Sequence, residues 1–167
     1  IDDIIVYKLS SGFMLVVNAS DIDKKYKWLE SNKIDGVHIE NKSNDLSMLA
    51  FQGPKSKRIL QSLINDDISN LRFYNFIEKI NCLGHDILLS RTGYTGELGF
   101  EVYCKHDAVK IIWENILNNF KKDGVLPAGL GARDTLRLEM GYLLYGNDMN
   151  IDIHPFKAGL GWITSLE

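Results

Sequence analysis

An acidic residue follows a glycine-rich stretch in residues 90–103, which read SRTGYTGELGFEVY. This residue, Glu101, lies between Phe100 and Val102 in a run that is typical of a β-strand. Alternation along a strand places Phe100 and Val102 on one face and Glu101 and Tyr103 on the other. Glu101 therefore faces either water or a cavity. In a cavity, its two oxygens would accept hydrogen bonds from a heterocycle that presents two adjacent N–H donors.

The glycines before it, Gly93, Gly96 and Gly99, follow a Gly-x-x-Gly-x-x-Gly spacing. A dinucleotide-binding loop needs Gly-x-Gly and leads into a helix, whereas this stretch has Thr95 two residues after Gly93 and leads into a strand. One interpretation is a hairpin connection with glycines at positive φ. The other is a glycine-lined wall against which a flat ligand lies, with Tyr94 and the carboxylate directed toward it.

A basic pair lies in residues 129–141, GLGARDTLRLEMG, which are predicted to form a helix. Arg133 and Arg137 share one helix face, and Asp134 and Arg137 are spaced as an i,i+3 ion pair worth about 0.2–0.5 kcal/mol. A solvated ion-pair helix is one interpretation. In the other, glycines open the first turn to close approach, and Arg133 donates to a ligand carbonyl or carboxylate.

Two further carboxylates, Asp2 and Asp3, precede the apolar run IIVYKL. They are either hydrated groups at the start of a strand or, by alternation, groups of which one points inward and needs hydrogen bonds. The histidines have no metal-ligand spacing, and Cys82 and Cys104 form no Cys-x-x-Cys motif. We therefore expect neither a metal site nor a disulfide framework.

Composition limits the class of protein. The chain has 167 residues, of which 45% are hydrophobic and 25% charged, so it should bury an ordinary core. A net charge of −3 with scattered lysines and arginines predicts no binding to nucleic acid or to an anionic membrane. No apolar run reaches the roughly 20 residues of a membrane span. The first residues already read as a strand, which suggests an internal piece of a longer protein.

The elements that must position these residues alternate between hairpins and helices. We expect strands at 4–9, 13–17, 36–40, 46–53, 76–81, 85–91 and 100–104, and helices at 22–32, after Pro54, at 107–121 and at 130–140. Hairpins mixed with helices predict an α+β fold with antiparallel sheets and packed helices rather than a doubly wound parallel sheet.

Several segments together resemble the aminomethyltransferase family, the T-proteins of the glycine cleavage system. The segments are IDDIIVY, LVVNAS, FQGPKS, SRTGYTGELGFEVY, LPAGLGARDTLRLEMGYLLYGNDM and HPFKAGLGW. They occur in the family's order and cover essentially the whole chain. The resemblance implies the three-domain folate-binding fold of that family. Residues 1–45 would end one α+β folate-binding subdomain, 46–150 would form a second, and 151–167 would begin the connection to a C-terminal β domain.

The same resemblance implies an enzyme that transfers a one-carbon unit to tetrahydrofolate. The unit comes from the aminomethyl group on the lipoyl arm of the H-protein, and ammonia is released. Tetrahydrofolate is thus the implied co-substrate, the lipoylated H-protein is the partner, and no metal is implied. The implied compartment is the bacterial cytoplasm or, in a eukaryote, the mitochondrial matrix.

Family positions map onto individual residues of this chain. The implied catalytic residue is Asp3, beside the reactive folate nitrogens. The implied folate-binding residues are Glu101, Arg133, Tyr94, Trp162, Met14, Val16 and Tyr145.

Two alternatives keep the folate but change the function. Similar domains serve as folate-dependent demethylases or in methylated-amine oxidation, and the intact GYTGELGFE and GLGARD motifs favour glycine cleavage over these. Non-enzymatic folate-binding regulators of the same fold usually carry a Lys-Gly-Cys-Tyr-like motif. This chain has Arg91-Thr92-Gly93-Tyr94 at that point, which weakens that alternative.

Overall fold

The structure, a computed structural model, describes residues 3–164, and the contacts within the chain divide it into two units. Unit 1 takes in residues 1–41 and 142–167, and unit 2 takes in residues 42–141. Both contain antiparallel strands and helices, so the expected α+β class is confirmed. The predicted subdomain boundaries after residues 45 and 150 refer to the three-domain family fold and stay a prediction.

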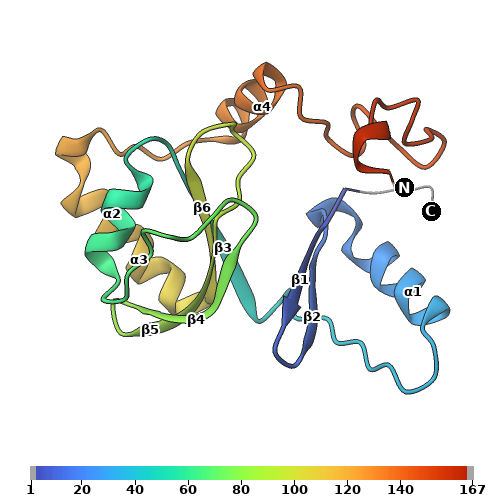
Figure 1. The fold of residues 1–167 in the computed structure, drawn as a ribbon, viewed down its shortest axis with the longest axis horizontal. Coiled ribbons are helices and arrows are strands. Elements are labelled where there is room, and N and C mark those ends of the chain that lie inside the picture. The colour runs from blue at the N-terminus through green and yellow to red at the C-terminus, as the bar shows by residue number, and fades with distance from the viewer. Residues whose placement is uncertain (1–2, 165–167) are drawn as a thin grey trace. The chain divides into compact units, whose positions relative to one another are not determined.

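A four-stranded antiparallel sheet forms the centre of unit 2 (Figure 1). Its order is β3-β6-β5-β4, and the strands are β3 (Leu46–Gln52), β6 (Gly99–Lys105), β5 (His85–Ser90) and β4 (Phe76–Cys82). The expected turn between β4 and β5 is present, with φ of 51° at Leu83 and 86° at Gly84. Asn81 Oδ1 accepts the Gly84 N–H at 3.1 Å, which closes this turn.

Two helices of unit 2 pack on the sheet and build its core. These are α2 (Ser56–Leu63) and α3 (His106–Asn119), and both helices were expected from the sequence. Leu60 of α2 and Ile112 of α3 are fully buried in the same cluster as Phe100 of β6. Because the core takes one face of β6, the alternate residues of this strand are left for the other face.

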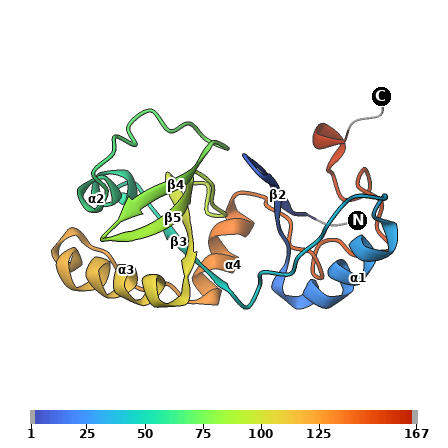
Figure 2. The same ribbon diagram turned by 90° about the horizontal axis from the view of Figure 1, so that it is seen from below.

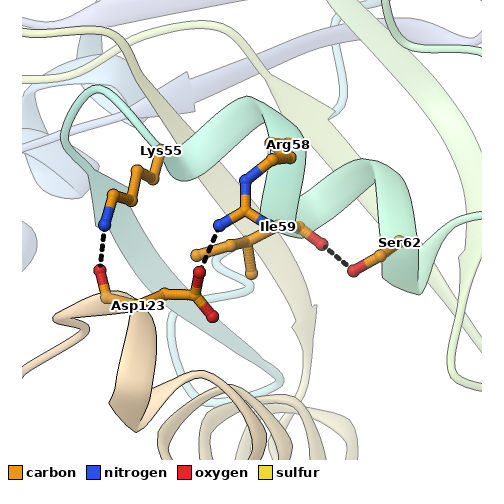
Figure 3. Close-up of polar contacts among 5 residues, drawn as sticks. All are labelled: Lys55, Arg58, Ile59, Ser62 and Asp123. Atoms are coloured by element: carbon orange, nitrogen blue, oxygen red, sulfur yellow. Dashed lines mark hydrogen bonds and ion pairs between the residues drawn. The ribbon is translucent and has the colours of Figure 1, made fainter.

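A polar link joins α2 to the short 3₁₀ helix η2 (Lys121–Asp123) that follows α3 (Figure 3). The Asp123 carboxylate accepts a hydrogen bond from the Arg58 guanidinium, and its backbone oxygen accepts one from Lys55 Nζ at 2.6 Å. Exposed ion pairs of this kind contribute about 0–1 kcal/mol. The link holds the start of the connection that leads to α4 (Leu130–Glu139). In Figure 2, α2 and α4 lie on opposite sides of the strands of unit 2.

Unit 1 is built from a hairpin and a helix. Strands β1 (Ile5–Leu9) and β2 (Gly12–Val16) pair antiparallel, and α1 (Ile22–Asn32) follows through the 3₁₀ helix η1 (Ala19–Asp21). Residues 142–164 add loops and the 3₁₀ helix η3 (Gly161–Ile163). Among the described residues of this unit, the hydrophobic side chains classed as buried are Tyr7 and Met149.

The predicted strand at residues 36–40 is wrong. These residues pair with no strand, and Val37 is 44% exposed. The local sequence has the alternation of a strand, but β-propensity is realised only where a neighbouring strand and a buried face are present. The other expected strands and helices are present with small shifts at their ends.

Candidate functional site

Strand β6 holds Glu101 with its side chain away from the core. Phe100 and Val102, its neighbours, are fully buried in the core cluster, as alternation predicted. Glu101 is only 9% exposed although it lies on the other face. A carboxylate this buried needs hydrogen-bonding partners to offset its lost hydration.

Two hydroxyl groups supply those partners. Glu101 Oε2 accepts hydrogen bonds from Thr92 Oγ1 at 2.6 Å and from the Tyr103 hydroxyl at 3.0 Å. Ser90 Oγ lies 2.9 Å from Thr92 Oγ1, and it must donate to Thr92 because the single Thr92 proton goes to the carboxylate. Hydrogen bonds to a charged acceptor are strong, so this network fixes the orientation of Glu101.

Glu101 lines a cavity of about 720 Å³ within unit 2. Tyr94 and Arg133 line the same cavity, together with an apolar wall that includes Met48, Phe51 and Trp113. This volume falls in the range of about 300–1,000 Å³ that small-molecule sites occupy. A mostly apolar hollow with a few convergent polar groups is also the usual form of such a site.

The two arginines of α4 have different roles. Arg137 is 3% exposed, and its Nε and Nη2 both donate to Asp134 Oδ1, at 2.8 and 2.7 Å. The predicted ion pair is therefore present, but its arginine is buried rather than solvated. Arg133 is exposed and stacks on the Tyr94 ring, with the guanidinium carbon 4.4 Å from the ring centroid. Arg133 thus offers its donors at the cavity while Arg137 stabilises the helix.

The glycine-rich stretch is a loop between β5 and β6. Gly96 has φ of 75°, a conformation that favours glycine. Its missing Cβ also leaves room for Met140, whose Cγ and Sδ would lie 2.4 Å from such an atom. At Gly93 and Gly99, the missing Cβ makes room for the side chain of Gln52. The close approach expected at these glycines is thus made by protein side chains.

The remaining predicted site residues belong to unit 1. Asp3 is exposed just before β1, where its backbone oxygen accepts Asn18 Nδ2 at 3.2 Å. Met14 and Val16 are half-buried on one face of the hairpin, opposite Tyr7 and Ile5 in the ladder. Asp2, the alternative to Asp3, lies outside the described residues.

The two aromatic residues predicted in unit 1 differ in burial. Tyr145 lines a second, apolar cavity of about 330 Å³ together with Trp28, and Lys25 Nζ lies 5.1 Å from the centroid of its ring. Trp162 is 82% exposed in η3. Of the predicted residues, the structure thus brings Glu101, Tyr94 and Arg133 together in one cavity, and it describes the other five within unit 1.

Sequence reasoning missed three residues of this site. Thr92 and Tyr103 orient the carboxylate, and Gln52 packs under the glycine loop. Alternation did place Tyr103 on the Glu101 face, which was the available signal for its hydrogen bond. Gln52 lies 40 or more residues from its partners along the chain, so no local pattern could find it.

Other chemical features can be stated for residues 3–164. No three His, Cys, Asp or Glu side chains gather closely enough there to hold a metal ion. No helix in that range is both long enough and apolar enough to cross a membrane. Cys82 and Cys104 are buried free thiols, and burial raises the pKa of Cys82 to about 11. A thiol held neutral in this way is a poor nucleophile.

Comparison with known proteins gives a consistent result. A family model described as the GCVT N-terminal domain matches residues 1–167. Aminomethyltransferases of Caldanaerobacter subterraneus subsp. tengcongensis and Halalkalibacterium halodurans are 49% and 43% identical over the whole chain, which covers 45% and 46% of their lengths. The crystal structure of glycine cleavage system aminomethyltransferase T from Bartonella henselae superposes with a TM-score of 0.82 at 33% identity, over 96% of this chain and 42% of that one. The chain therefore spans about half the length of its relatives.

Proposed function

The chain belongs to the GCVT N-terminal domain family, and from that premise we propose that it forms part of an aminomethyltransferase of glycine cleavage. The reaction would move a one-carbon unit from the aminomethyl-lipoyl arm of the H-protein to tetrahydrofolate and release ammonia. The observation that carries the proposal is the buried Glu101 carboxylate, oriented by two hydroxyls in a cavity of ligand size. The names of the relatives add independent support.

Glu101 would recognise the pterin ring of tetrahydrofolate. The ring presents its 2-amino group and N3–H side by side, and a carboxylate has about four acceptor positions. Thr92 and Tyr103 take two of these, both at Oε2, which leaves capacity for the two pterin donors. The hydroxyls hold the carboxylate in place before the ligand arrives, so binding costs little further ordering of this side chain.

Tyr94 and Arg133 would complete recognition in the same cavity. Their stack lies in the cavity that the carboxylate also lines, and an aromatic ring of this kind can cover an edge of the pterin. Arg133 keeps donors for a carbonyl oxygen, a task for which the planar guanidinium is suited. In this proposal Arg137 has no ligand role, since its ion pair with Asp134 is internal to the helix.

The residues of unit 1 would serve the reacting end of the folate. Asp3 would lie near N5 and N10, orient the cofactor and stabilise positive charge on the transferred carbon. The aromatic and aliphatic residues of unit 1 would surround this end of the folate and keep water from the reactive one-carbon unit. This set comprises Trp162, Met14, Val16 and Tyr145.

The test is a donor comparison with the full-length protein. We expect methylenetetrahydrofolate and ammonia in equal amounts from aminomethylated H-protein and tetrahydrofolate, and no turnover with dimethylglycine or sarcosine as donors. Turnover of the methylated amines alone would support the demethylase alternative instead. Folate binding without turnover of any donor would support the non-enzymatic regulator.

A further inference from the structure

Gly93 and Gly99 are glycines for a reason other than their backbone angles. Neither has a positive φ, in contrast to Gly96 between them, so an alanine could adopt the backbone conformation at both positions. Glycine at such a position usually indicates close approach by another group. The question is therefore which group occupies the space that a Cβ would take.

The side-chain amide of Gln52 occupies this space at both positions. A Cβ added at residue 99 would lie 1.8 Å from Gln52 Oε1, and one added at residue 93 would lie 2.0 Å from the same atom. Both distances are far below van der Waals contact, so either side chain would expel the amide. At both positions the three atoms nearest to such a Cβ belong to Gln52.

The same amide is bonded to both ends of the loop. Gln52 Nε2 donates to the backbone oxygen of Phe100 at 3.0 Å and to that of Thr92 at 3.2 Å. A primary amide nitrogen has two protons, so both are committed and none is left for a ligand. Of the two residues that the amide joins, Thr92 lies two residues before Tyr94, and Phe100 directly precedes Glu101.

We propose that Gln52 is a positioning residue whose amide fills the space left by Gly93 and Gly99 and holds the loop that sets Tyr94, Thr92 and Glu101 at the folate cavity. This inference rests on the proposed function. It adds a role to Gln52, the last residue of β3, which pairs with Gly99 in the sheet. The next residue, Gly53, donates its N–H to the Leu98 oxygen at 2.7 Å.

The fit between Gln52 and the glycines is tested by a double-mutant cycle in the full-length protein without ligand. Gly99→Ala should lower the thermal midpoint of the otherwise wild-type protein. In the Gln52→Ala background the same substitution should cause a loss that is smaller by about 2–4 °C or more. Gly96→Ala is the control, because its strain comes from φ and from contact with Met140 rather than from Gln52, and it should be the same in both backgrounds. Equal losses for Gly99→Ala in the two backgrounds would overturn the proposal.

The positioning role is tested by titration with tetrahydrofolate at a temperature at which every variant is folded. Gln52→Met keeps the length of the side chain but donates no hydrogen bond, and it should weaken binding about tenfold, which corresponds to about 1.4 kcal/mol. Gln61→Met is the matched control. Its amide also bridges backbone oxygens, those of Asp66 at 2.9 Å and Ile64 at 3.2 Å, but in α2 and its following turn.

Gln61→Met should therefore lower stability and leave the dissociation constant unchanged. An unchanged constant for Gln52→Met, or an equal loss for both variants, would overturn the positioning role. A wild-type protein that binds no tetrahydrofolate would overturn the proposed function itself. The wild-type titration thus tests the proposed function. The ligand-free double-mutant cycle tests the contact between Gln52 and the glycines independently of it.

Discussion

Unit 2 and unit 1 support their proposed site residues in different ways. In unit 2, Glu101 lies on a strand whose other face is anchored by the fully buried Phe100, and two hydroxyls fix its carboxylate. In unit 1, Asp3 and Trp162 are exposed, and the helix α1 has no buried residue. A side chain keeps a defined orientation where the opposite face of its strand or helix packs in a hydrophobic core. The proposed function therefore rests on the geometry of unit 2, whereas the roles proposed for the unit 1 residues rest on the family resemblance.

The largest expected effect is a loss of unfolding free energy, and it should differ between a phenylalanine of unit 2 and a phenylalanine of unit 1. Phe100→Ala should lower the free energy of unfolding by about 3–5 kcal/mol, because it empties a fully packed site in the core. Phe13→Ala should change it by less than about 0.5 kcal/mol, because that ring is 68% exposed on β2. Urea unfolding of both variants measures the contrast. Similar losses for the two would mean that unit 1 is as well anchored as unit 2.

The next effect concerns ligand affinity in unit 2. Glu101→Ala removes a charged acceptor and should weaken tetrahydrofolate binding by about 1.5–3 kcal/mol, with a smaller effect on stability. Calorimetric titration measures it, and Glu97→Ala is the control. Glu97 is an exposed residue of the same glycine loop and lies outside the cavity lining. If both variants bind tetrahydrofolate as the wild type does, the pterin contact is excluded.

In unit 1 we expect an effect on turnover. Asp3→Ala should reduce methylenetetrahydrofolate production at least about tenfold, or about 1.4 kcal/mol of barrier, through lost orientation and charge stabilisation. Asp35→Ala, at another exposed position of unit 1, should have no effect. Wild-type rates for Asp3→Ala in a steady-state assay would refute its catalytic role.

The last expected effect is a pH dependence that reports on unit 2 alone, because both cysteines lie there. Burial raises the pKa of Cys82 from 9.0 to about 11. A raised pKa for an acidic group stabilises the fold below pH 9, and this contribution is lost as the pH rises toward 11. At pH 8 a thiol reagent should modify neither cysteine until the protein unfolds. Rapid modification of the native protein would show that the core of unit 2 opens readily.

How far the sequence predicted these features depends on the range of the interactions. The bounds of α1 and α4 and the two faces of β6 follow from periodicities within a few residues, and these predictions are confirmed. The strand expected at residues 36–40 failed because a strand depends on a partner elsewhere in the chain. Gln52 escaped prediction for the same reason, since its contacts cross 40 to 48 residues.

The site shows the same division. Alternation predicted that Glu101 and Tyr103 share a face, and their 3.0 Å hydrogen bond bears this out. The burial of Arg137 could not be predicted, because the charge spacing on α4 is the same for a solvated ion pair and for a buried one. The ligand roles of Asp3 and the other unit 1 residues come from the family resemblance alone. These roles stay predictions, as do those of Glu101, Tyr94 and Arg133.

The central claim is that Glu101 binds the pterin of tetrahydrofolate within unit 2. A crystal structure of the full-length protein with tetrahydrofolate measures this directly. We predict that the pterin 2-amino nitrogen and N3 lie about 2.7–2.9 Å from the Glu101 carboxylate oxygens, with Thr92 and Tyr103 still bonded to Oε2. A pterin bound elsewhere, for example in the apolar cavity beside Tyr145, with Glu101 contacting only its two hydroxyl partners, would contradict the account.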